Sequence, residues 1–203
     1  DGTRLRDTQC GLFATGKVLR RFGVAFTYLT NCRLSDPVFE RGVRDFLAVC
    51  NVVKRFRSIR ILQISTRPFD FWTTMCNEGE LLEKFNIQLS PIPMPELTDA
   101  IRQAKEDGTE VAETIKYCKE KMEILVEDEA LENVAALAVA MKRLVNQYGC
   151  QAAAIQCWNQ LQSEIGIMPC AANSLLNEEG IPVVCETDIH GAVTALMVEA
   201  AGM

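Results

Sequence analysis

The chain has 203 residues, of which 48% are apolar and 24% are charged, proportions typical of a globular protein with one sizeable core. Its 27 acidic residues outnumber its 21 basic residues, which gives a formal net charge of −6. The sequence contains neither a basic stripe nor an apolar run of membrane-spanning length, so we expect no nucleic-acid and no membrane partner. We expect a single domain over residues 1–203 that is a piece of a longer protein.

Nine cysteines are present, an odd number, and none of them forms a Cys-x-x-Cys motif. Several lie inside apolar segments, where a free thiol behaves as a small apolar side chain. This usage favours a reducing compartment over a disulfide-linked scaffold. The expected location is the cytoplasm.

The first part of the chain has helical periodicity. A first helix is predicted from a cap at Asp7 to a stop at Gly23, because apolar residues recur at helical spacing and basic residues fall in the last turn. Residues 24–29 form a short apolar run that predicts a strand. Asp36-Pro37, a capping residue followed by proline, predicts a second helix that reaches residue 56.

The following segments alternate between strand and helix patterns. Residues 59–65 are rich in β-branched side chains and indicate a buried strand. Residues 77–85 indicate a helix, and residues 87–92 an extended segment. Residues 96–148 are helical throughout, with breaks near Asp107-Gly108 and Glu127-Asp128.

Two more strands are predicted, at residues 152–157 and 181–185, with a helix at residues 169–179 between them. Strands that alternate with helices require crossover connections and a parallel sheet. We therefore predict a doubly wound α/β fold, with a mostly parallel sheet and helices on both faces, in the Rossmann-like three-layer arrangement.

The strand at residues 181–185 leads into two carboxylates, Glu186 and Asp188, at the edge where parallel α/β sheets bind ligands. If the chain stays extended, both side chains point to one side and can hold a hard divalent cation or move protons. The simpler interpretation is that Asp188 caps a helix beginning at Ile189 and that Glu186 forms a surface ion pair. We favour a functional role for Glu186 and leave both interpretations of Asp188 open.

His190 is the single histidine of the sequence. It can ligate a metal beside the carboxylates, or act with a nucleophilic cysteine such as Cys157, Cys170 or Cys185. A zinc site made of Cys170, Cys185 and His190 is a further option. The spacing of these residues matches no strong zinc or Cys-His pattern.

Gln156 and Trp158 follow the strand of small residues, so we expect them at the same sheet edge as Glu186. An amide beside an aromatic ring suits a polyhydroxylated ligand, because the amide bonds hydroxyls and the ring packs against C–H groups. The same residue types are common in ordinary loops, so both interpretations stay open. Residues 66–72, with an arginine and three aromatic rings, either line this crevice or pack on a neighbouring domain.

Several motifs of common enzyme classes are missing from the sequence. It has no G-x-G-x-x-G, no G-x-x-x-x-G-K-[ST] and no G-x-S-x-G. A dinucleotide enzyme, a P-loop NTPase and an α/β-hydrolase are therefore not expected.

Five short segments carry a family resemblance. They are Cys10-Gly11-Leu12-Phe13-Ala14, Thr66-Arg67-Pro68-Phe69, Asn77-Glu78-Gly79-Glu80-Leu81, residues 156–160 and Cys185-Glu186-Thr187-Asp188. In this order they resemble the central part of fucose isomerase-like proteins, the group that includes L-fucose and L-arabinose isomerases.

The resemblance implies an aldose–ketose isomerase that uses a divalent cation, commonly Mn²⁺, and moves a proton between C1 and C2 of a monosaccharide through an enediol. Glu186 matches the glutamate of the family's Glu-x-Asp segment, which ligates the metal and takes part in acid–base chemistry, and Asp188 is the aspartate of that segment. In sequence, Gln156 falls near the position of a glutamine that faces the sugar in members of that family.

In that family the other two metal ligands, an aspartate and a histidine, come from sequence downstream of Met203, and His190 does not match the ligand histidine. The resemblance therefore implies a piece that is inactive by itself, and a homo-oligomer for the complete protein. The alternative is a non-catalytic α/β module that binds carbohydrate or a partner protein.

Overall fold

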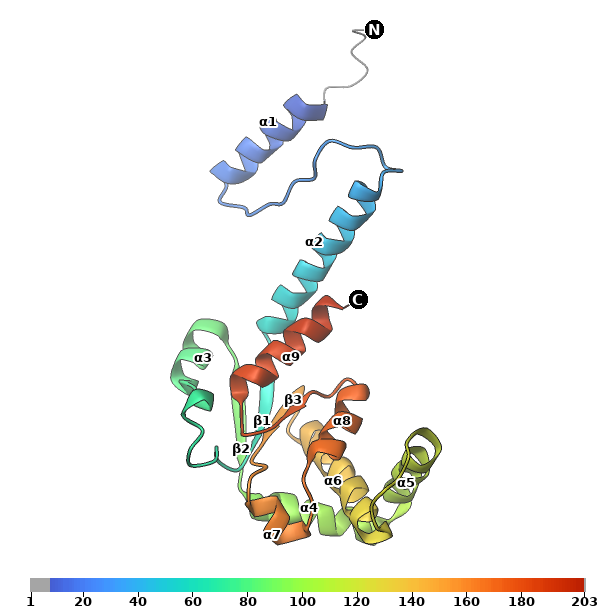
Figure 1. Cartoon of the computed structure of the whole chain (residues 1–203). Coiled ribbons are helices and arrows are strands. Elements are labelled where there is room, and N and C mark those ends of the chain that lie inside the picture. The colour runs from blue at the N-terminus through green and yellow to red at the C-terminus, as the bar shows by residue number, and fades with distance from the viewer. Residues whose placement is uncertain (1–7, 203) are drawn as a thin grey trace. The chain divides into compact units, whose positions relative to one another are not determined.

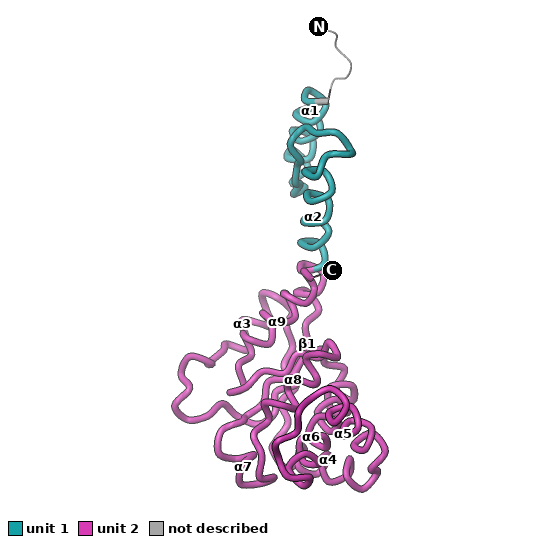
Figure 2. Tube along the Cα trace, turned by 45° about the vertical axis from the view of Figure 1, so that its right-hand side comes forward, with its two compact units in different colours: residues 1–51 teal, residues 52–203 magenta. Residues whose placement is uncertain are grey.

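The computed structural model describes residues 8–202, so Asp7, at the predicted start of the first helix, lies outside the described residues. The chain divides into two compact units, residues 1–51 and residues 52–203 (Figure 2). Each unit is described by itself below. The single domain expected over residues 1–203 stays a prediction.

The first unit is helical. Helix α1 (Thr8–Arg21) ends just before Gly23, whose φ of 66° is the left-handed conformation that favours glycine at a helix end. Helix α2 (Pro37–Phe56) begins at the predicted proline and runs into the second unit. None of the residues of α2 is buried.

Residues 24–29 form no strand, so this prediction was wrong. Their side chains pack on the helices: a Cβ at Gly16 of α1 would come within 3.0 Å of the Phe26 ring, and a Cβ at Gly42 of α2 would overlap Leu29. No strand in the described part of the chain pairs with this segment. A strand needs a partner for its backbone groups, so the apolar run reflects contacts with helices.

The second unit alternates strands and helices (Figure 1). In chain order its elements are β1 (Arg60–Ile64), a 3₁₀ helix (Trp72–Thr74), α3 (Glu78–Phe85), β2 (Gln88–Ile92), α4 (Met94–Asp107), α5 (Thr109–Lys121), α6 (Asp128–Gln147), β3 (Ala152–Ile155), α7 (Gln160–Ile165), α8 (Cys170–Glu178), β4 (Val183–Val184) and α9 (Ile189–Ala201).

The four strands found among residues 8–202 form one sheet in the order β2-β1-β3-β4, and all neighbours are parallel. Ile64, at the end of β1, is in register with Ile92 of β2 on one side and Ile155 of β3 on the other. The chain leaves β1 towards β2 and then returns past β1 to β3. The predicted doubly wound parallel α/β fold is confirmed, and its strand order reverses between β1 and β3.

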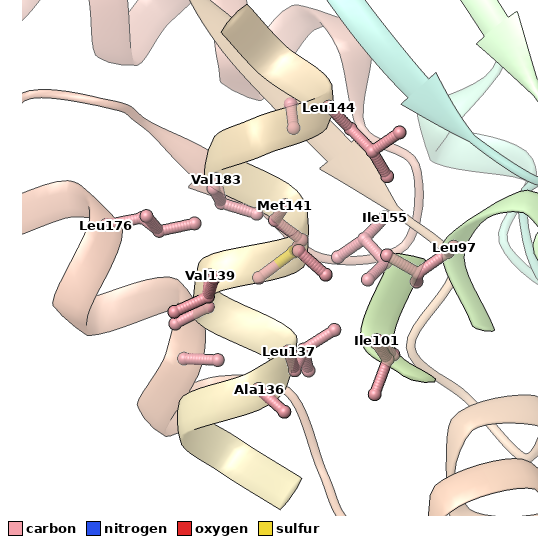
Figure 3. Close-up of a cluster of buried hydrophobic side chains, with 14 of the residues drawn as sticks. Leu97, Ile101, Ala136, Leu137, Val139, Met141, Leu144, Ile155, Leu176 and Val183 are labelled. Carbon is pink, nitrogen blue, oxygen red and sulfur yellow. The ribbon is translucent and has the colours of Figure 1, made fainter. Parts of the chain in front are cut away.

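One face of the sheet packs on α4, α6 and α8 (Figure 3). Leu137 and Met141 of α6 are fully buried, with Leu97 of α4 on one side and Leu176 of α8 on the other. Ile155 of β3 joins the same cluster. Each such side chain stabilises the fold by about 1.5–3 kcal/mol relative to an exposed one.

The opposite face packs on α3 and α9. Leu81 of α3 and Leu196 of α9 contribute to a cluster with Ile61 of β1 and Ala154 of β3. Successive residues of β1 and β3 therefore alternate between the two clusters, as the pleat of a strand requires. Helices cover both faces of the sheet, which is the predicted three-layer arrangement.

Most predicted boundaries in the second unit agree with the structure. The break at Gly108 separates α4 from α5, and the break near residue 128 precedes α6. Helix α7 was not predicted, and β4 is shorter than residues 181–185. None of the described helices combines the length and the apolar composition needed to cross a bilayer.

Candidate functional site

Three loops meet where β1, β3 and β4 end. Residues 65–71 follow β1, residues 156–159 follow β3, and residues 185–188 follow β4. Backbone hydrogen bonds tie two of these loops to the end of the neighbouring strand, because Gln156 N donates to Ile64 O of β1 at 3.0 Å and Thr187 N donates to Ile155 O of β3 at 3.1 Å. The strand order reverses between β1 and β3, and doubly wound sheets bind ligands at such a point.

The same loops hold an unusual share of strained backbone. Ser65, Asn159, Glu186 and Thr187 have φ values of 66°, 64°, 56° and 53°, in the left-handed region that side chains other than glycine rarely adopt. Such residues cost of order 1–3 kcal/mol each and cluster at functional sites. Among the described residues, the one other non-glycine residue with positive φ is Asn86, which caps the end of α3.

Gln156 and Trp158 lie at the predicted edge. Ser65 Oγ donates to Gln156 Oε1 at 2.6 Å, which fixes the amide between β1 and β3. The Trp158 ring meets Phe71 edge-on, with their centroids 5.4 Å apart. They border a pocket of about 470 Å³ lined by Pro68, Phe69, Asp70, Phe71, Gln156, Trp158, Asn159, Gln160 and Ser163. The loop after β1 thus forms a wall of the pocket that Gln156 and Trp158 line, whereas Glu186 is not among the lining residues.

Glu186 is half-buried beside the loop that follows β3. Its Oε1 accepts a hydrogen bond from Cys157 Sγ at 3.2 Å, and Cys157 lies between Gln156 and Trp158 in the chain. In the described part of the chain, no lysine or arginine forms an ion pair with this carboxylate. The surface ion pair considered for Glu186 is therefore not formed there.

Asp188 caps helix α9. Its Oδ1 accepts a hydrogen bond from Gly191 N at 2.9 Å, and a Cβ at Gly191 would come within 2.7 Å of Oδ2. The extended geometry that would place Asp188 and Glu186 on one side is not kept, because residues 186 and 187 are left-handed. The capping interpretation of Asp188 is realised, while its role as a metal ligand stays a prediction.

His190 lies on the exposed side of the first turn of α9. It borders one shallow surface pocket with Asn77 and Glu80 and another with Asp188. Within the described residues, His190 is not part of any cluster of three or more metal-ligating groups. The zinc set of Cys170, Cys185 and His190 is therefore not assembled.

A different cluster is present. Ligand atoms of Cys157, Cys185 and Glu186 all lie within 4.8 Å of one another. Burial, and then the neighbouring Cys157 and Glu186, raise the pKa of Cys185 to about 12. The pKa of Cys157 is also raised, mainly by burial. Both thiols are therefore protonated at neutral pH unless a cation or a base takes their protons.

Sequence reasoning missed two buried polar side chains, Asn173, which contacts this cluster, and Thr187, which follows Glu186 in the chain. Asn173 of α8 donates from Nδ2 to Cys185 Sγ at 3.4 Å, and its Oδ1 has no hydrogen-bond partner although the residue is 5% exposed. Thr187 is 4% exposed, and its Oγ1 likewise lacks a partner. A motif search does not find Asn173, because its only link to the site is the packing of α8 beside β4.

These donors fit Mn²⁺ only in part. Mn²⁺ prefers carboxylate, carbonyl and water oxygens, and Glu186 supplies one such group. Cys157 and Cys185 beside it offer sulfur, which Mn²⁺ does not select. The described residues therefore do not form a complete manganese site.

Comparisons with known proteins point to sugar isomerases. Residues 1–57 match the family model described as the N-terminal domain of fucose/sulfoquinovose isomerase. A sulfoquinovose isomerase of Alkalicoccus urumqiensis is 28% identical over 183 residues, covering 89% of this chain and 40% of that protein. Sulfoquinovose isomerases of Priestia megaterium and of a Clostridium species are 24% and 25% identical, over 95% and 96% of this chain and 43% and 44% of their own length.

The chain spans about two-fifths of the length of the curated relatives that it matches. The short motifs at the strand-exit loops, the matched N-terminal domain and these relatives agree with one another. The chain is therefore similar to sugar isomerases of the fucose isomerase-like group, through residues 1–57 to their N-terminal domain and through most of its length to sulfoquinovose isomerases.

Proposed function

We propose that the protein is an aldose–ketose isomerase that acts on a monosaccharide, and that this chain supplies part of its site. The observation that carries the proposal is the half-buried carboxylate of Glu186, which has no ion-pair partner among the described residues. It contacts Cys157, which lies in the chain between the pocket-lining Gln156 and Trp158. The sugar-isomerase relatives support the same reaction class. Sulfoquinovose, named in those relatives, is the first substrate to test.

In the proposed reaction Glu186 moves one proton. The carboxylate takes the proton from C2 of the open-chain aldose, exchanges it with solvent and protonates C1 of the enediol, while a hydroxyl proton passes from O2 to O1. The sugar gains and loses no atoms, so the reaction needs no redox cofactor. The carboxylate suits this role, because a positioned side chain that can take up and release a proton contributes about 10²- to 10⁴-fold to the rate.

The side chains around the crevice have separate proposed roles. Gln156 is held by Ser65, so its amide NH₂ group is left to donate to a sugar hydroxyl. Trp158 offers a half-exposed ring face to the C–H groups of the sugar. We propose that both residues orient the substrate and leave proton transfer to Glu186.

We also propose that the complete protein uses a divalent cation such as Mn²⁺. A bound cation would polarise the carbonyl and hydroxyl oxygens of the sugar. Glu186 is the one member of the Cys157, Cys185 and Glu186 cluster that suits a hard ion. The missing oxygen or nitrogen ligands would therefore have to come from elsewhere in the complete protein.

The complete protein is proposed to be a homo-oligomer in the cytoplasm. All nine cysteines lie in the described part of the chain and are free, which suits a reducing compartment. In the first unit, Phe13, Phe22 and Phe46 are exposed, and a surface that contacts another subunit would cover such side chains.

Deuterium incorporation tests the proposed function. The complete protein is incubated with sulfoquinovose, and separately with common aldoses, in D₂O, and the products are analysed by NMR. We expect a ketose that carries solvent deuterium at C1, and loss of turnover when a chelator removes divalent cations. Sugar binding that is indifferent to the chelator, without any ketose, would identify a non-catalytic carbohydrate-binding module instead.

Replacing Trp158 by alanine should weaken sugar binding by about 2- to 10-fold, because aromatic packing contributes about 0.5–1.5 kcal/mol. Isothermal titration of the complete protein measures this change. Trp72→Ala is the matched control, since Trp72 is also exposed but packs under Arg67, 5.4 Å from its ring, and is not part of the pocket lining. Equal affinities for Trp158→Ala and the unaltered protein would remove Trp158 from the sugar site.

A further inference from the structure

Two cysteine thiols and a carboxylate converge where β3 and β4 end. Cys157 follows β3, and Cys185 and Glu186 follow β4, so adjacent parallel strands bring the three side chains together. Their ligand atoms all lie within 4.8 Å of one another, and Cys157 Sγ is 3.2 Å from Glu186 Oε1. Each group can become an anion, and in the described part of the chain none of them has a lysine or arginine partner.

These separations suit a small tetrahedral ion. Zinc binds sulfur at about 2.3 Å and carboxylate oxygen at about 2.0–2.2 Å, so neighbouring ligands of a tetrahedral site are about 3.6–3.8 Å apart. The cluster needs only small side-chain rotations to reach that spacing. Two sulfurs and one oxygen are also a donor set that zinc selects and that Mn²⁺ and Mg²⁺ do not.

Asn173 is an independent sign of a ligand at this position. Its side chain reaches the cluster from α8, because Nδ2 donates to Cys185 Sγ at 3.4 Å. The other atom of the same amide, Oδ1, has no partner although Asn173 is 5% exposed. Leaving a buried acceptor unpaired costs about 1–3 kcal/mol, so such atoms usually face a water or an ion.

We propose that Cys157, Cys185 and Glu186 bind one thiophilic divalent cation of the zinc type, with Asn173 as a positioning residue beside the fourth coordination position. When the ion binds, each S–H bond breaks, a sulfur–metal bond forms and the two protons pass to solvent. The amide of Asn173 donates to the sulfur of Cys185, and its free oxygen accepts from a water on the ion. Three protein ligands with an open fourth position differ from a structural zinc site, which has four protein ligands.

The proposal does not depend on the isomerase activity. Glu186 is a ligand both in this zinc-type site and in the Mn²⁺ site proposed above. The two cations therefore cannot occupy Glu186 at the same time. Zinc binding would therefore inhibit an isomerase that works with Mn²⁺, but the site itself is detected by binding alone.

The experiment uses the complete protein, fully reduced, in metal-free buffer. Zn²⁺ is supplied from a chelator buffer, the thiols are then alkylated, and each cysteine peptide is quantified by mass spectrometry. We expect Zn²⁺ to slow the alkylation of Cys157 and Cys185 at least about 10-fold and to leave exposed Cys10 and Cys50 unchanged, with Mn²⁺ giving no protection at the same free concentration. This readout needs no substitution, so it stands even if a variant fails to fold.

Co²⁺ gives a second readout through its sulfur-to-metal charge-transfer absorption. Cys157→Ser and Cys185→Ser should each weaken Co²⁺ binding at least about 10-fold, and Asn173→Leu should weaken it less. Cys150→Ser is the matched control, because Cys150 is buried but outside the cluster.

Equal alkylation of Cys157 and Cys185 with and without Zn²⁺ would overturn the proposal. A Co²⁺ spectrum that persists in a folded Cys157→Ser, Cys185→Ser double variant would overturn it as well. Neither result bears on the deuterium experiment, so failure of this site and failure of the isomerase proposal remain distinguishable.

Discussion

Glu186→Gln should lower turnover of the complete protein by about 10²- to 10⁴-fold, the contribution of a positioned general acid–base group. Glutamine keeps the size of the side chain and an oxygen that can still accept from Cys157 Sγ, which lies 3.2 Å from Oε1. It loses the negative charge that takes a proton from carbon. Initial rates of ketose formation measure the change.

The loss should appear in kcat more than in KM. Glu186 acts on the reacting carbons, whereas Gln156 and Trp158 are proposed to hold the sugar, so substrate binding should survive the substitution. Glu199→Gln, an exposed carboxylate on α9, is the matched control and should leave both constants unchanged. Full turnover by a folded Glu186→Gln protein would remove Glu186 from the chemistry.

The stability of the Glu186→Gln variant separates chemistry from folding. Thermal unfolding should shift little, since Glu186 has no ion pair to lose among the described residues. Asp188→Asn, by comparison, alters the cap of α9. A large drop in stability for Glu186→Gln would mean that the carboxylate holds the three loops together.

The sequence predicted the sheet well because burial and chain direction are local properties. Ile61, Leu62 and Ile64 of β1 are buried, and β3 is a buried run of small residues ending in Ile155, as expected for strands inside a parallel sheet. Because these strands alternate with helices, the rules for connections between parallel strands allow only a few topologies. Gln156 and Glu186 follow neighbouring parallel strands, so the sequence pattern was enough to predict both at one edge of the sheet.

The finer geometry of the site could not be predicted in this way. Glu186 and Thr187 adopt left-handed backbone, which no sequence pattern signals for residues of these types. That turn places Asp188 at the N-terminal cap of α9 and places Glu186 within hydrogen-bonding distance of Cys157. The pairing of Cys157 with Cys185 depends on which strands are neighbours, and the run at residues 24–29 showed that apolar spacing does not establish pairing.

Leu137→Ala should destabilise the second unit by about 2–5 kcal/mol, because it removes a fully buried side chain and leaves a cavity. Leu137 lies in α6, in the cluster shared with Leu97 of α4 and Ile155 of β3 (Figure 3). Packing there supports the end of β3, from which Gln156 and Cys157 emerge. A loss of this size is a large fraction of the 5–15 kcal/mol by which domains are typically stable.

Native-state hydrogen exchange of the amides of β3, residues 152–155, measures the loss of stability next to the site. These amides exchange only when the surrounding core opens. Their opening free energy should fall by the same amount as global stability. Leu125→Ala is the matched control: Leu125 is 84% exposed, and its truncation should change stability by no more than about 0.5 kcal/mol. Unchanged protection of β3 in Leu137→Ala would show that α6 does not support the strand, and that the site edge is held by the loops alone.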